Sequence, residues 1–99
     1  MILSWFDAAE AKKFGVILAR FFTERMSPVA QAGDMKFAVK TDKVLNQMAD
    51  QIARFKQVHK LNTYKKAQLG NAFKWALKDA GVTPAYIDEL TRWLMLQIG

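Results

Sequence analysis

Hydrophobic residues recur along most of the chain at the three-to-four-residue spacing that is typical of amphipathic helices. The first such run follows Ser4, which can cap a helix, and precedes Pro28, which disfavours helical geometry in the residue before it. Asp7 and Glu10 fall where the positive end of a helix dipole favours carboxylates. The pattern predicts a helix over residues 4–26. Its apolar positions are Phe6, Ala9, Phe14, Ile17, Leu18, Phe21 and Phe22.

The helical period is lost over residues 27–40. Gly33 and Asp34 indicate a turn, and the hydrophobic residues that follow alternate with polar or small ones in a two-residue rhythm. This rhythm predicts an extended segment. Since a single strand has no pairing partner within the chain, the expected form is an ordered loop over the helices, with strand exchange between two copies as the alternative. The alternating residues are Met35, Phe37 and Val39.

Two further helices are predicted on either side of a weak break. Thr41 can cap a helix over residues 42–60, and a second apolar run predicts a helix over 63–80. The break near Asn62 is weak enough that one long bent helix is the alternative. The apolar seam of the first of these helices consists of Leu45, Met48, Ile52 and Phe55.

The clearest junction lies just before the last helix. Gly81 suits the left-handed position after a helix, and Val82 can fold back onto Leu77 as in a Schellman motif. Thr83 can then cap a helix over residues 84–98 that has Pro84 at its first position, where a missing N–H costs nothing. The buried face of this helix is predicted to be Tyr86, Ile87, Leu90, Trp93, Leu94 and Ile98.

Together these elements predict an all-α, four-helix bundle-like single domain over residues 1–99, with an extended loop over 27–40 between the first two helices. A chain of 99 residues lies in the usual range for one domain. About half of its residues, 52%, are hydrophobic, which indicates a folded chain with a substantial core.

Residues that could carry catalysis are few. The chain has no cysteine. Its two serines are explained by helix boundaries, since Ser4 caps the first predicted helix and Ser27 lies where that helix ends. The one histidine, His59, continues the seam that contains Met48, so a half-buried histidine bonded to a neighbour is a better interpretation than a catalytic group or a haem ligand. The five glycines of the chain are scattered singly, so they do not form a phosphate-binding loop. We therefore expect a protein that is not an enzyme and that uses no cofactor or metal.

Composition also bears on location. The absence of cysteine favours a reducing compartment, and the first residues lack the basic region, apolar core and cleavage site of a secretory signal. No run approaches the roughly 18 uncharged apolar residues of a membrane span. The expected location is the cytoplasm.

Positive charge is concentrated in one window. The net charge is +6, yet no acidic residue lies between Asp50 and Asp79. Such a window could neutralise the phosphates of a nucleic acid, while Tyr64 and Trp75 lie close enough to stack on bases. A solvated cationic face is the simpler interpretation. The cations of this alternative nucleic-acid site are Arg54, Lys56, Lys60, Lys65, Lys66, Lys74 and Lys78.

Apolar residues cover more than one stripe of the first and last predicted helices. No helix of a four-helix domain can be surrounded on all sides, so the surplus predicts a contact with another macromolecule. Self-association as a twofold dimer is the expected form, and an interfacial membrane contact is a weaker alternative. The function predicted from the sequence is a non-catalytic interaction or regulatory module. Its partner-binding residues are predicted to be Trp5, Phe6, Phe21, Phe22, Trp93, Met95 and Leu96.

Overall fold

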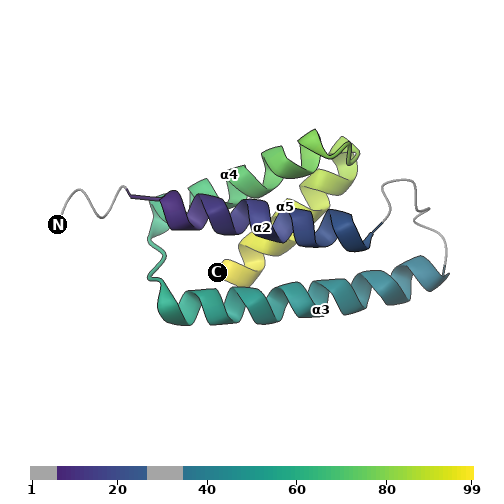
Figure 1. Cartoon of the computed structure of the whole chain (residues 1–99), viewed down its shortest axis with the longest axis horizontal. Coiled ribbons are helices and arrows are strands. Elements are labelled where there is room, and N and C mark those ends of the chain that lie inside the picture. Colours follow the sequence, from purple (N-terminus) through teal and green to yellow (C-terminus); the bar gives the residue numbers. More distant parts are fainter. Residues whose placement is uncertain (1–6, 27–34) are drawn as a thin grey trace.

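Each of the helices predicted from the apolar spacing forms in the computed structural model, which describes residues 7–26 and 35–99, with side chains for 7–26 and 41–99. The helices are α2 (Ala9–Arg25), α3 (Met35–Val58), α4 (Thr63–Asp79) and α5 (Pro84–Ile98) (Figure 1). Among the described residues there is no strand. The all-α, four-helix fold class is therefore confirmed.

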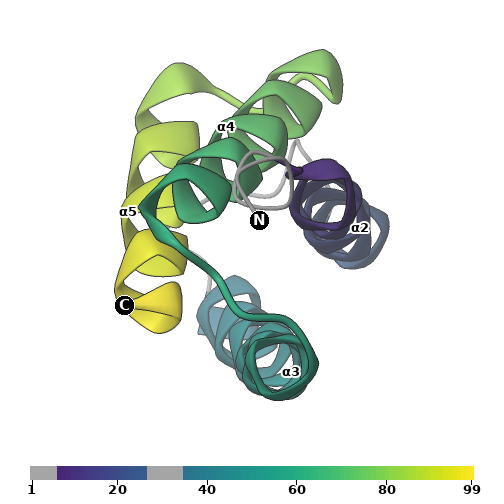
Figure 2. The same ribbon diagram turned by 90° about the vertical axis from the view of Figure 1, so that its left-hand side faces the viewer.

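Each helix has two neighbours in the bundle (Figure 2). α4 packs against α2 and α5, and α3 packs against the same two helices from the opposite side. α2 and α4 run in one direction, while α3 and α5 run in the other (Figure 1). The most extensive packing joins α2 to α4. The eight largest fully buried side chains come from all four helices and are Phe73, Leu18, Met48, Ile52, Leu69, Leu77, Leu94 and Ile98.

Small residues allow α2 and α4 to approach closely. A Cβ built on Gly15 would lie 2.5 Å from the main-chain oxygen of Leu69 and 3.1 Å from the Cβ of Ala72. Ala11 and Ala19, one turn to either side of Gly15, are also buried. The two helices therefore meet backbone to backbone at Gly15, where a side chain would hold them apart.

The junctions around α4 follow the sequence signals. The Asn62 side chain accepts a hydrogen bond of 2.8 Å from the backbone N–H of Lys65, which caps α4 and separates it from α3. This excludes the alternative of one long bent helix. At the other end, Gly81 has a φ of 87°, its N–H donates to the Lys78 carbonyl, and the Val82 N–H donates to the Leu77 carbonyl. These are the paired bonds of the predicted Schellman motif.

Gly81 provides a test of this junction. Nothing lies within 4 Å of a Cβ built at Gly81, so Gly81→Ala introduces no clash and changes only the backbone energy. Because an L-residue is strained in the left-handed region, the variant should lose about 1 kcal/mol of unfolding free energy, measured by urea denaturation. An unchanged stability would show that the α4–α5 turn does not depend on this conformation.

Two predicted helix starts, those of α3 and α2, need correction. α3 begins at Met35, so the extended segment predicted for residues 35–40 is wrong; residues 27–34, including the proposed strand exchange, lie outside the described residues. A two-residue rhythm over so short a run cannot be separated from a helical one, because Phe37 also stands in helical spacing with Thr41 and Val44. Thr41 accordingly lies inside α3 and does not cap it.

The second correction concerns α2, while α5 begins at Pro84 as predicted and lacks only its expected cap. α2 begins at Ala9, whose N–H donates a 3.2 Å hydrogen bond to the Asp7 carboxylate. The predicted cap, Ser4, lies outside the described residues. Thr83 occupies the predicted cap position of α5, but its side chain makes no capping bond, so Pro84 alone fixes this start as expected.

Tyr86 carries a pH dependence that can be measured. Burial raises the pKa of the Tyr86 phenol; a side-chain hydrogen bond with Thr41 opposes this shift, and the nearby Glu89 carboxylate adds to it. A raised pKa means that the unfolded chain ionises first, so Tyr86 adds stability below about pH 10 and loses it as the pH rises further. Chemical denaturation should show a smaller alkaline loss of stability in Tyr86→Phe than in the parent protein. Equal losses would assign the alkaline dependence to other groups.

Candidate protein-binding surface

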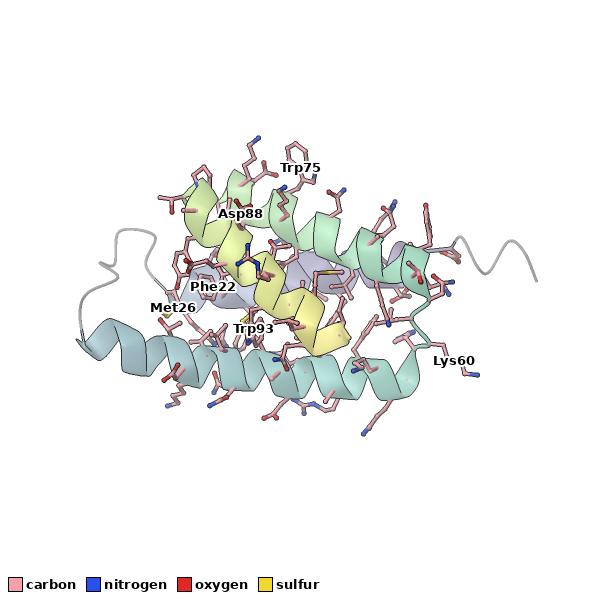
Figure 3. All side chains as sticks on the ribbon, turned by 180° about the vertical axis from the view of Figure 1, so that it is seen from behind. Phe22, Met26, Lys60, Trp75, Asp88 and Trp93 are labelled. Carbon is pink, nitrogen blue, oxygen red and sulfur yellow. The ribbon has the colours of Figure 1, made fainter. Side chains whose placement is uncertain are left out.

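Most aromatic residues of the predicted partner-binding set belong to the fold itself. Phe22 is buried and contacts the Tyr86 ring edge-on at 5.7 Å between centroids, so its predicted place on a binding surface is corrected to the core. Phe21 is half-buried under the Arg25 guanidinium, which lies 3.6 Å from its ring centroid. Trp93 is also half-buried and extends from α5 toward α3 (Figure 3). Trp5 and Phe6 lie outside the described residues.

Met95 and Leu96 are the members of that set that reach the surface. They are adjacent on α5, with 38% and 74% of their surface exposed. Met95 also covers the neighbouring helix, because its sulfur lies 2.7 Å from a Cβ built on Gly70 of α4. Leu96 has no such role in the core, so most of its side chain is free to contact another molecule.

Other exposed apolar side chains stand apart from this pair. Ile17 of α2 is 54% exposed between the exposed charged residues Lys13 and Arg20. Trp75 of α4 is 53% exposed, and the Lys78 ammonium lies 4.7 Å from its ring centroid. Single exposed apolar residues are normal on soluble proteins, so neither residue defines a patch by itself.

The basic window does not form one face. Lys56 of α3 donates a 3.2 Å hydrogen bond to the main-chain oxygen of Gln97, and Lys66 of α4 donates a 3.1 Å bond to that of Gly99. Both lysines therefore flank the carboxyl-terminal end of α5, where cations are favoured by the helix dipole. Gly70, one turn along α4 from Lys66, is buried, so it separates Lys66 from the exposed Lys74 further along the helix.

The remaining cations of the window lie in three other places. Arg54 turns back along α3 to the Asp50 carbonyl, at 3.4 Å. Lys60 and Lys65 line a cleft at the end of α3, and Lys60 lies well away from Trp75, which projects from α4 (Figure 3). Lys74 and Lys78 are exposed on the outer face of α4. The structure thus divides the charge that looked continuous in the sequence.

His59 lies in that cleft, at the end of an aromatic stack. Phe14 stacks on Phe55 with ring centroids 4.2 Å apart, and Phe55 stacks on His59 at 4.4 Å. The His59 side chain is half-buried, in agreement with its predicted place beside the seam. The stack joins α2 to the end of α3, which gives the imidazole a packing role. The cleft measures about 330 Å³, and carboxylates of Asp7 and Glu10 line it beside the lysines.

Nothing in the described part of the chain assembles a metal site, since it contains no group of three His, Asp or Glu side chains placed to hold an ion. None of the helices over the described residues is long and apolar enough to cross a bilayer. No family model, curated protein or solved structure matches the chain. Functional inference therefore depends on the surface geometry.

The outer face of α5 is the surface that combines apolar exposure with ordered charge. We call the exposed residues of this face the α5 surface; they are Ala85, Asp88, Glu89, Arg92, Met95 and Leu96. Its carboxylates lie in the amino-terminal half of the helix and its apolar pair in the carboxyl-terminal half, next to the end that Lys56 and Lys66 flank. The two lysines at the carboxyl-terminal end match the helix dipole.

Proposed function

We propose that this protein is a non-catalytic interaction module that binds a protein partner through the α5 surface. The observation that carries the proposal is the exposure of Leu96, 74%, beside the partly exposed Met95. Removing apolar surface from water contributes about 25 cal/mol for each Å², so covering this pair would favour association. The surrounding charges of Asp88, Glu89 and Arg92 would orient the partner. The cysteine-free composition supports a cytoplasmic location as part of the same proposal.

The α5 surface is narrower than the aromatic surface predicted from the sequence. The aromatic residues of α2 and α5 are largely used in packing the four helices together, which leaves an apolar centre of two side chains within a charged rim. A small apolar centre and a polar rim are typical of interfaces between proteins that also exist separately. We therefore expect a regulated or reversible contact.

The test is photo-crosslinking in the native cell, with a photoreactive amino acid at position 96 or, as a matched control, at position 17. Both positions hold exposed aliphatic residues, but Ile17 lies on α2 among charged residues. We expect a discrete protein adduct from position 96 and none of the same mass from position 17. Equal adducts from the two positions, or none from position 96, would overturn the proposal. Adducts destroyed by nuclease would instead support the nucleic-acid alternative.

A further inference from the structure

We infer that the partner of the α5 surface is a second copy of this chain, and that the two α5 helices pair antiparallel about a twofold axis between Arg92 and Leu96. The inference rests on the proposed function and specifies its partner. Charge is distributed unevenly along α5. The surface that must be matched is acidic at one end and flanked by lysines at the other.

The acidic end is well defined. Asp88 and Glu89 are both exposed in the amino-terminal half of α5, and neither takes part in an ion pair that would neutralise it within the described residues. Figure 3 shows Asp88 near the start of α5. A partner that covers this end of α5 should therefore present cations to it.

The opposite end presents such cations. Lys56 and Lys66 approach the last turn of α5 from α3 and α4, and their bonds to Gln97 and Gly99 hold them there. An ammonium group has three donors, so one bond to a carbonyl leaves others to offer to a carboxylate. The α5 surface and the two lysines that flank its end thus supply both halves of an electrostatic match, one at each end of the helix.

Only one simple arrangement brings these halves together. Parallel pairing of two α5 helices would place like charges opposite each other, which is unfavourable. Antiparallel pairing places the carboxylates of each copy opposite the lysine-flanked end of the other, and it does so twice because a twofold contact is self-complementary. Arg92 of one copy then faces Leu96 of the other, and its aliphatic stem can cover the apolar side chain. The apolar pair lies at the centre of the contact.

The absence of cysteine makes this geometry directly testable. Single cysteines at exposed positions, Leu96→Cys and Ala85→Cys, should be treated with a short bismaleimide at low protein concentration. With the axis midway between Arg92 and Leu96, the two copies of position 96 are offset by about 6 Å along the helices and those of position 85 by about 27 Å, at 1.5 Å per residue. We expect a covalent dimer from Leu96→Cys and none from Ala85→Cys. Ile17→Cys is the control for random collision.

The results of this linking experiment distinguish antiparallel pairing from the alternatives. Linked dimers from both Leu96→Cys and Ala85→Cys would indicate parallel pairing and overturn it. No linked dimer from Leu96→Cys above the Ile17→Cys level, together with a parent protein that stays monomeric by light scattering, would overturn self-pairing altogether. The proposed function would survive that result if photo-crosslinking at position 96 gave an adduct with a different protein, and it would fail if no adduct formed.

A second measurement separates charge matching from simple apolar contact. Reversing both carboxylates, in Asp88→Lys with Glu89→Lys, should raise the dissociation constant of the dimer by about tenfold or more, as measured by light scattering across a dilution series. The matched control reverses Glu10 and Glu24 on α2, which are also exposed and give the same change in net charge. Equal effects of the two double variants would contradict antiparallel charge matching. Leu96→Lys should abolish the dimer while the helical content is retained.

Discussion

Phe73→Ala is expected to lower the free energy of unfolding by about 3–5 kcal/mol, the usual range for removing a buried aromatic ring. Phe73 is fully buried at the centre of α4, the helix that packs against both α2 and α5. A domain of this size has a total stability of about 5–15 kcal/mol, so the variant should lose a large share of its stability. Urea denaturation followed by circular dichroism measures the change.

Trp75→Ala is the matched control, because it removes a larger aromatic ring two positions further along the same helix. Trp75 is 53% exposed, and its contact is with Lys78. We expect a loss of less than about 1 kcal/mol, the size of an exposed cation–π contact. If Trp75→Ala destabilised the protein as strongly as Phe73→Ala, the orientation of α4 described above would be wrong.

Gly15→Ala is expected to cost about 1–2 kcal/mol, although alanine is the better helix former. The new Cβ would lie 2.5 Å from the main-chain oxygen of Leu69, and backbone cannot move aside as a side chain can. Overpacking of this kind costs about 1–3 kcal/mol, and the gain in helix propensity of up to about 1 kcal/mol offsets part of it. Thermal denaturation should show a fall of roughly 4–8 °C for each kcal/mol lost.

The same substitution at Gly70 isolates the cause. A Cβ at Gly70 would meet the sulfur of Met95, the end of a flexible side chain that is partly exposed and can turn away. Gly70→Ala should therefore be neutral or slightly stabilising through its higher helix propensity. A similar loss of stability in both variants would mean that the close approach of α2 and α4 at Gly15 is not what the first variant disturbs.

Much of the fold can be predicted from sequence because its signals are local. Gly81 and Val82 specify the turn before α5, Pro84 fixes the first residue of that helix, and the spacing of Met48 and Ile52 defines a buried seam. The start of α3 was missed because the residues after Met35 fit two periods equally well. In so short a run, the spacing of hydrophobic residues alone does not distinguish a helix from a strand.

The surface was harder to predict because it depends on contacts between distant residues. Lys56 and Lys66 meet the end of α5 across 41 and 33 residues of sequence, so the basic window could not be divided without the fold. Phe22 and Ile17 both fit a broad apolar stripe, yet one is buried and the other exposed. Helical spacing gives the direction of a face but not its width, which the neighbouring helices set.

The close contact at Gly15 also has a consequence for the order of folding. α2 meets α4 through residues as far apart in sequence as Gly15 and Leu69, so α2 cannot form this contact on the ribosome until α4 has been synthesised. The α4–α5 hairpin, by contrast, closes over a few residues, and the entropic cost of loop closure grows with loop length. We expect the α4–α5 hairpin to form first and α2 to pack against it last. The folding rate should then depend on the length of the chain between α2 and α4.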